Sequence, residues 1–212
     1  MYSSYTHMTE WHFYEPRAGH GLSHDPLNAM VAPRPIGWIS TVSATGVRNI
    51  APYSFFNLIN YMPPLIAFSS VGRKDSVANI EATGEFVWNL ATRDLAEAMN
   101  ATSAMVPPDV DEYELAGLDT LPSRFVAPVR VAASPVAFEC KLTQLIRLTD
   151  RHGDELNQYL VIGEAIGIHI DTAMLEDGVY QTARARPILR GGGPADYFDV
   201  TEANLFRMRR PG

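Results

Sequence analysis

The sequence has 212 residues, of which 46% are hydrophobic and 10% aromatic, and its formal net charge is −7. This length suits one large domain, and the apolar content is sufficient for a full hydrophobic core. The basic residues are scattered rather than clustered, which together with the acidic balance argues against DNA or RNA as a partner.

Membrane and secretory signals are missing from the sequence pattern. No run approaches the roughly 18 consecutive apolar residues of a membrane span. The stretch from Met1 to Glu15 lacks the basic and apolar regions of a signal peptide, so we expect a cytoplasmic protein. Cys140 is the single cysteine, which excludes a disulfide or a thiolate metal cluster within one chain. Redox chemistry would therefore need a bound cofactor.

The N-terminal part of the chain is predicted to be irregular. Prolines and glycines are dense there, which predicts an arm over residues 1–25 and at most a short helical turn over residues 27–31. Residues 36–44 are rich in β-branched and aromatic side chains, a Thr-Gly turn follows, and residues 48–56 continue in extended form. These two segments are expected to form a β-hairpin.

The next segment is predicted to place a helix between two strands. A proline pair precedes a short apolar strand over residues 65–70. Asp75 or Ser76 can then cap a helix that ends at Gly84. Residues 86–91 return as a strand.

The remaining elements complete a mainly β pattern. Thr92 is a suitable N-cap for a further amphipathic helix, after which the chain is expected to be loop up to residue 131. Residues 138–143 alternate between apolar and polar side chains, and residues 158–170 form a second candidate strand across a turn. From residue 175 the tail shows little periodicity, so its order is expected to depend on docking. Strands that come in hairpins favour an antiparallel barrel with a few flanking helices over a Rossmann sheet.

One short segment has the composition of a phosphate site. Arg73 can form bidentate hydrogen bonds, Lys74 supplies a point charge, and the first amides of the following helix attract an anion. Nearby hydroxyls can donate as well. The segment is Ser69, Ser70, Val71, Gly72, Arg73, Lys74, Asp75 and Ser76. The alternative interpretation is an ordinary solvated turn before a capped helix.

A second segment, from Asn49 to Phe56, mixes small, polar and aromatic residues that could line a flat aromatic ligand. The alternative is a core strand, because aromatic strand residues commonly pack in the interior.

Other reactive residue types carry weaker signals. His20 and His24 are four residues apart, but the glycines and proline around them disfavour a helix and so a shared metal site. His169 is expected to be a hydrogen-bonded core or interface residue, and Cys140 a buried inert thiol. No catalytic triad or paired-carboxylate motif is recognisable, so a cofactor is expected to carry out any chemistry.

Several motifs in fixed order carry a resemblance to a known family. They are PRPIGWISTVSATGVRNIAPYSFFN from Pro33, the Pro63-Pro64 step, FSS and RKDSVANI from Phe68 to Ile80, TGEFVWNL from Thr83, the Gly163-Glu164-Ala165 and IHID motifs, and RPILRGGGPADY from Arg186. Together they resemble the flavin-reductase-like family of FMN-binding split β-barrels. The resemblance implies a domain over residues 26–200, with an irregular arm at 1–25 and a tail at 201–212.

The resemblance also implies an antiparallel, Greek-key-like split β-barrel that forms a homodimer and holds FMN near the subunit interface. The cofactor-binding residues that it implies, for the flavin and its phosphate, are Ser40, Thr41, Asn49, Ala51, Pro52, Tyr53, Ser54, Phe55, Ser69, Ser70, Arg73, Lys74, Asp75 and Ser76. The glycines at 191–193 and Tyr197 are expected to close over the site or the interface.

The activity that the resemblance implies is hydride transfer from NADH or NADPH to FMN, which requires orientation rather than a catalytic side chain. Reduced flavin could then supply a monooxygenase partner. Two alternatives stay open: an FMN-binding carrier or oxidoreductase on another substrate without fast reductase turnover, and a barrel that no longer binds a ligand.

Overall fold

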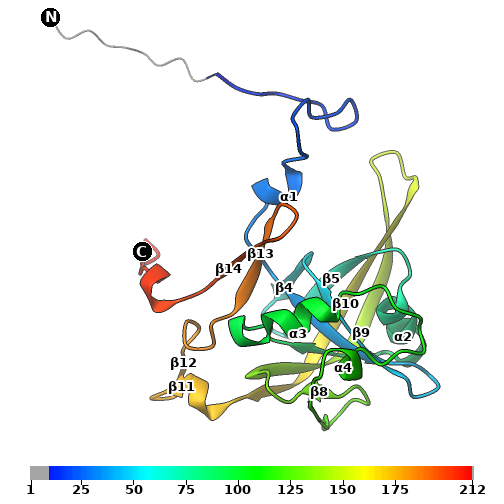
Figure 1. Cartoon of the computed structure of the whole chain (residues 1–212), viewed down its shortest axis with the longest axis vertical. Coiled ribbons are helices and arrows are strands. Elements are labelled where there is room, and N and C mark those ends of the chain that lie inside the picture. Colours follow the sequence, from blue (N-terminus) through cyan, green and yellow to red (C-terminus); the bar gives the residue numbers. More distant parts are fainter. Residues whose placement is uncertain (1–9, 212) are drawn as a thin grey trace, which may run out of the picture.

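A computed structural model describes residues 10–211 and shows a mainly β fold built on one large sheet (Figure 1). The sheet has seven strands in the order β3-β2-β6-β9-β10-β5-β4, and all neighbouring strands are antiparallel. The strands are β2 (Gly37–Val42), β3 (Arg48–Tyr53), β4 (Phe56–Asn60), β5 (Leu65–Val71), β6 (Glu85–Asn89), β9 (Val136–Thr149) and β10 (Glu155–Ile170). The predicted antiparallel split barrel with few helices is confirmed.

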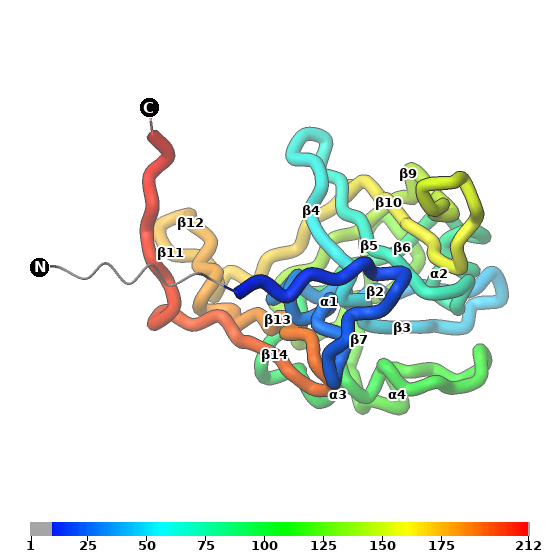
Figure 2. Tube along the Cα trace, turned by 90° about the horizontal axis from the view of Figure 1, so that it is seen from above, coloured from blue at the N-terminus to red at the C-terminus, as the bar shows by residue number. Residues whose placement is uncertain are grey.

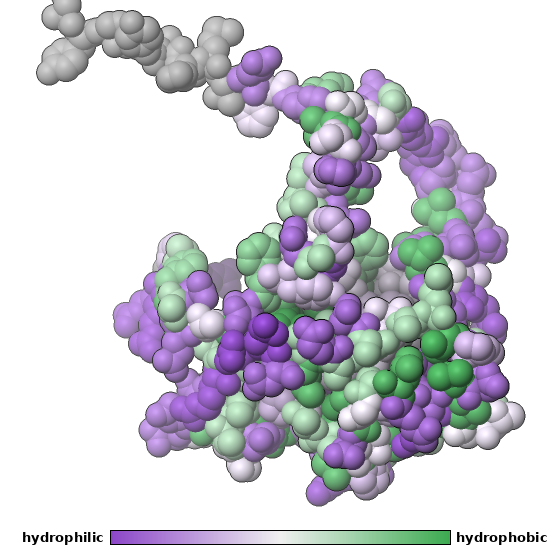
Figure 3. Space-filling model, in the orientation of Figure 1, coloured by the Kyte–Doolittle hydropathy of each residue, from purple (hydrophilic) through white to green (hydrophobic). Residues whose placement is uncertain are grey.

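Both predicted hairpins are present. In the first, β2 pairs with β3 from Gly37 opposite Tyr53 to Val42 opposite Arg48. In the second, β9 and β10 are the two longest strands, and their turn extends beyond the sheet. Figure 3 shows that this protruding tip is mostly hydrophilic, as expected for a hairpin end without core contacts.

Helices cover the sheet at a few places. They are α1 (Leu27–Met30), α2 (Asp75–Thr83), α3 (Ala96–Ala101) and α4 (Glu112–Leu115), with 3₁₀ turns η1 (Arg93–Leu95), η2 (Thr172–Met174) and η3 (Glu202–Asn204). The helix predicted to end at Gly84 is α2, and Gly84 adopts φ +71°, a conformation that glycine reaches without strain. The helix predicted after Thr92 begins as η1 and continues as α3.

The predicted N-cap of α2 is wrong. Lys74, rather than Asp75 or Ser76, occupies the N-cap position. The Ser76 hydroxyl donates to Asn49 Oδ1 on β3 at 2.9 Å. Ser76 therefore lies inside the helix, and its hydroxyl bonds to a residue distant in sequence rather than to the helix start.

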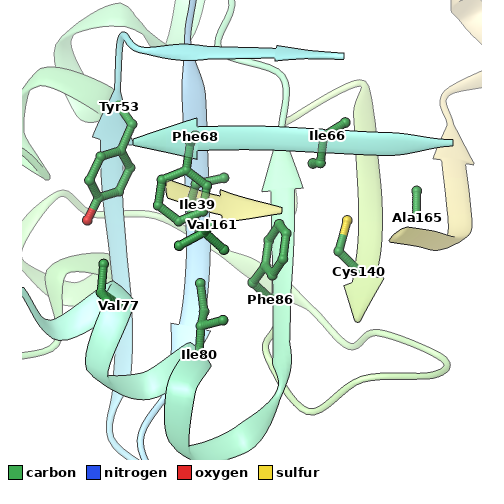
Figure 4. Close-up of a cluster of buried hydrophobic side chains, with 10 residues drawn as sticks. All are labelled: Ile39, Tyr53, Ile66, Phe68, Val77, Ile80, Phe86, Cys140, Val161 and Ala165. Atoms are coloured by element: carbon green, nitrogen blue, oxygen red, sulfur yellow. The ribbon is translucent and has the colours of Figure 1, made fainter. Parts of the chain in front are cut away.

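The main core lies between α2 and the concave face of the sheet (Figure 4). The Tyr53 and Phe68 rings have centroids 4.6 Å apart, and Phe68 meets Phe86 edge to face at 5.9 Å. Val77 and Ile80 enter this cluster from α2 and are fully buried. Alternation along β2 directs Ile39 to this cluster and its neighbour Trp38 to a second cluster on the other face.

The stretch predicted as loop up to residue 131 contains three short elements, so that prediction is corrected. Besides α4 it holds β7 (Thr120–Leu121) and β8 (Arg130–Val131), which pair with each other. The Asp111 carboxylate caps α4 by accepting from the Tyr113 N–H at 2.9 Å. Elements of two to four residues leave too little periodicity to be recognised from sequence.

A smaller sheet stands beside the main one. It joins β1 (Arg34–Pro35), β13 (Ile188–Gly192) and β14 (Asp196–Asp199), so the tail is ordered by docking, as predicted. Gly192, at φ +83°, lies so close to α1 that a Cβ there would be 2.5 Å from Ala29 Cα. The remaining pair is β11 (Leu175–Glu176) with β12 (Val179–Tyr180).

The chain ends leave the sheet in different directions. Figure 2 shows the N-terminal arm crossing above α1 and the C-terminal residues lying on the side of β11 and β12. Over residues 10–25 the arm has no helix or strand, while the part of the predicted arm before residue 10 lies outside the described residues. Within the described range, no helix is long and apolar enough to cross a membrane.

Candidate functional site

The two segments singled out from the sequence line one cavity of about 370 Å³. One wall is β3, the last strand at its end of the sheet, and another is the start of α2. The residues that follow α3, together with α4, complete the lining. The lining residues are Asn49, Ala51, Pro52, Tyr53, Lys74, Asp75, Ser76, Thr102, Ser103, Ala104, Met105, Val106 and Glu112. The fold therefore brings together seven of the predicted site residues.

Asn49 is the centre of a buried hydrogen-bond network on the β3 wall. Its Oδ1 accepts from the hydroxyls of Thr41 at 3.0 Å and Ser76 at 2.9 Å, which ties β2, β3 and α2 together. Its Nδ2 donates to Glu112 Oε1 at 2.8 Å. Asn79 adds a donor to Thr41 from the next turn of α2. A network with all its polar groups bonded fixes the shape of this wall.

Glu112 is a cavity residue that sequence reasoning missed. Its carboxylate accepts from Asn49 and, through Oε2, from the backbone N–H of Ile50 at 3.3 Å. Burial raises the pKa of Glu112, and these hydrogen bonds oppose that rise. In the sequence, Glu112 is only an acidic residue after Asp111, in a helix that was not predicted. Nothing in this local pattern indicates that its side chain reaches β3.

The start of α2 offers an anion-binding end to the cavity. Lys74 is exposed and forms no ion pair or side-chain hydrogen bond with any residue between 10 and 211. The first backbone bond of the helix runs from the Ala78 N–H to the Lys74 carbonyl at 2.9 Å, so the N–H groups of residues 75–77 have no intrahelical acceptor. Free N–H groups at the positive end of a nine-residue helix dipole, next to a free ammonium group, suit a phosphate.

The other predicted phosphate ligands lie beside this cavity and already have partners. Arg73 pairs with Glu81, which lies in the second turn of α2 on its exposed side. Ser69 accepts a hydrogen bond from Gln158 on β10. Ser70 donates to the Gly72 carbonyl at 3.0 Å. To contact a phosphate, these side chains would have to exchange their present bonds.

Tyr53 connects the cavity with the hydrophobic core. Its ring packs against Phe68, and Figure 4 shows its hydroxyl directed toward the start of α2, where Val77 lies. Burial raises the pKa of the Tyr53 hydroxyl, against the opposing influence of Ser76 and Ser70. The phenol therefore stays neutral near pH 7 and can act as a hydrogen-bond donor.

Besides Thr41, Ser69, Ser70 and Arg73, three further predicted residues, Ser40, Ser54 and Phe55, are not in the cavity lining. Ser40 is fully buried, and its hydroxyl accepts from Tyr113 Oη at 2.5 Å and Asn89 Nδ2 at 2.8 Å. The Ser54 carbonyl accepts from Arg34 Nε at 3.1 Å, and the Arg34 guanidinium lies 5.5 Å from the centre of the half-exposed Phe55 ring.

His20, His169 and Cys140 have structural partners. His20 Nδ1 accepts from the Leu22 N–H at 3.0 Å, and residues 10–211 contain no cluster of His, Cys, Asp and Glu suited to a metal ion. The prediction that His169 is a hydrogen-bonded residue is confirmed, because it pairs with Glu139 at 2.5 Å. Cys140 is buried as predicted, and this burial raises the pKa of its thiol.

The fold is an antiparallel split barrel with a cavity at the edge of its sheet. A family model described as flavin reductase like domain matches residues 30–189. The chain is 39% identical over 170 residues to an uncharacterized protein of Aquifex aeolicus, covering 77% of this chain and 83% of that protein. The chain therefore belongs to the flavin reductase like family, and the resemblance seen in the motifs is confirmed.

Two solved structures are similar to this chain in both sequence and fold. Nitrilotriacetate monooxygenase component B from Bacillus cereus is 31% identical, with a TM-score of 0.79 over 88% of this chain and 98% of that one. The 2-nitrobenzoate 2-nitroreductase NbaA from Pseudomonas fluorescens is 28% identical, with a TM-score of 0.76 over 87% and 88% of the two chains.

Proposed function

We propose that the cavity between β3 and α2 binds FMN and that the protein is an NAD(P)H-dependent flavin reductase. The observation that carries the proposal is that one cavity contains both kinds of group: the free ammonium group of Lys74 with the free amides at the start of α2, and the hydrogen-bonded, partly aromatic wall of β3. The cavity volume of about 370 Å³ falls within the roughly 300–1,000 Å³ common for small-molecule sites. The residues present therefore fit a ligand with a phosphate at one end and a planar ring at the other.

Each wall has a separate task in this proposal. Lys74 and the first amides of α2, that of Ser76 among them, hold the phosphate, while Asn49 and Tyr53 offer polar groups to the ring and its side chain. Bound FMN supplies the hydride-accepting chemistry that the side chains of the site cannot supply. The chain contributes binding, orientation and exclusion of water, so the proposal includes no catalytic acid or base.

In this proposal, the segment after α3, residues 102–106, covers the bound FMN. Residues 102–106 line the cavity, and the Met105 side chain is 97% exposed at its mouth. An exposed methionine there offers a flexible apolar surface for the nicotinamide of NADH or NADPH.

We further propose that the working unit is a homodimer. An apolar surface along β4 and its turn supports this, since contiguous exposed apolar residues mark interaction sites. Its members are Phe55, Leu58, Ile59, Tyr61 and Met62. A monooxygenase that consumes the reduced flavin is a second proposed partner, supported by the similarity to the Bacillus cereus protein, which is itself a monooxygenase component. The cytoplasm, where NADH and NADPH are generated, is the proposed location.

Anaerobic titration of the FMN-loaded protein with NADH and then NADPH tests the activity. Rapid loss of the visible absorbance of oxidised flavin is expected, and the faster donor is the physiological one. Bound flavin that stays oxidised with both donors would refute the reductase and favour an FMN carrier or an oxidoreductase on another substrate. Failure to take up FMN at all would refute the binding site itself.

A further inference from the structure

A second cavity, of about 580 Å³, lies between the segment 121–135 and the end of β10. It shares no described lining residue with the cavity proposed for FMN. Figure 1 shows β8 at the lower edge of the molecule, away from the start of α2. A ligand bound here would therefore be distinct from one bound between β3 and α2.

A buried carboxylate holds this cavity in shape. Glu139 is fully buried and accepts from the backbone N–H groups of Arg124 at 2.8 Å and Phe125 at 2.6 Å. Its third donor is His169 on β10. Burial alone would raise the pKa of Glu139, but these hydrogen bonds, with His169 foremost, lower it. The loop that carries Arg124 and Phe125 is thus fixed against the sheet by a charged anchor.

Two guanidinium groups line the cavity without a carboxylate partner. Arg130 is half-buried, and its Nε donates to the Pro122 carbonyl at 3.3 Å. Its two terminal nitrogens have no acceptor, and Arg124 forms no ion pair, among the residues that the structure describes. Asp171 is the one carboxylate in the described lining, and its Oδ1 already accepts from the Ala173 N–H. Two guanidinium groups against one carboxylate leave the described lining with an excess of positive charge.

An apolar platform lies beside these charges. The Phe125 ring packs on the backbone of β10, where a Cβ at Gly167 would be 3.0 Å from the ring. The Phe125 side chain is nevertheless 60% exposed, so its outer face is available for stacking. Ile168 is half-exposed and also lines the cavity.

We propose that this cavity binds an oxyanion carried on an aromatic body, with Arg130 and Arg124 holding the oxyanion and Phe125 stacking on the ring. A planar guanidinium forms paired, charge-assisted hydrogen bonds with a carboxylate or a phosphate, so both groups satisfy the site. The ligand is then either an aromatic carboxylate or an aromatic nucleotide phosphate.

Isothermal titration of the full chain with benzoate and, separately, with AMP tests the proposal and distinguishes the two sources. We expect at least one probe to bind and its affinity to fall at least tenfold in the double variant Arg124→Gln, Arg130→Gln. Arg124→Gln alone is a second variant at an exposed position, where folding is not at risk, and a partial loss is expected.

Two controls locate the binding. Arg151→Gln removes an exposed arginine at the tip of the β9–β10 hairpin and is expected to change nothing. Lys74→Ala alters the other cavity and should also leave the affinity unchanged, so the result does not depend on FMN. Absence of binding by both probes, equal binding by the double variant, or a loss confined to Lys74→Ala would overturn the proposal.

Discussion

Replacing Lys74 with alanine is the sharpest test of the phosphate end of the FMN cavity. Lys74 is free and stands at the first turn of α2, whereas Arg73 is already paired with Glu81. A charge-assisted hydrogen bond contributes about 1.5–3 kcal/mol. Because Lys74 is exposed, solvent screening reduces this to roughly 1–2 kcal/mol, which corresponds to a loss of about 5- to 30-fold in FMN affinity.

Arg73→Ala is expected to weaken FMN binding less, by under about threefold. Its guanidinium must leave an exposed ion pair to reach a phosphate, and such a pair contributes up to about 1 kcal/mol, which offsets much of the new interaction. This order reverses the usual expectation that arginine is the stronger phosphate ligand.

The assay is fluorescence titration of FMN and, in parallel, of riboflavin, which lacks the phosphate. Lys74→Ala should weaken FMN binding and leave riboflavin binding unchanged. Lys141→Ala is the matched control, because Lys141 is the other lysine of the chain and pairs with Glu85 on the sheet. Wild-type FMN affinity in Lys74→Ala, an equal loss for riboflavin, or a larger loss in Arg73→Ala would refute the reasoning.

Three further predictions concern stability. The pKa of Glu139 is lowered in the folded state, so ionised Glu139 stabilises the fold above its unfolded pKa, and this stabilisation is lost as pH falls through the folded pKa. The difference in unfolding free energy between the wild type and Glu139→Gln should therefore shrink on acidification. A difference that does not change with pH in denaturant titrations would contradict this. Gly163→Ala places a Cβ against the fully buried Phe86 ring and should destabilise the fold by roughly 1–3 kcal/mol; unchanged thermal unfolding would show that the ring moves freely. Asn49→Ala removes the hydrogen-bond partner of the Glu112 carboxylate and of the Thr41 and Ser76 hydroxyls. It should lower the free energy of unfolding, measured with urea, by roughly 2–4 kcal/mol. A loss below about 0.5 kcal/mol would mean that water replaces the amide.

Short-range patterns along the chain predict the local elements, and the ordered motifs predict the family. Alternating apolar residues define the hairpins that became β2–β3 and β9–β10, and Gly84 ends α2 where expected. Strand pairing in a hairpin and the end of a helix depend on residues that are close together along the chain, so the local sequence pattern is sufficient to predict them. The motifs for the phosphate and ring segments likewise predicted two walls of one cavity.

The partner that each polar side chain of the site takes depends on the folded arrangement of distant segments. Glu112 reaches Asn49 across 63 residues of sequence, from a helix too short to recognise. The Ser76 hydroxyl bonds to Asn49 instead of capping α2. Arg73 pairs with Glu81, while Lys74 has no such partner within residues 10–211. Partners of polar side chains are chosen among groups that are close in space, and the burial that sets the strength of each bond exists only after the sheet has closed around them.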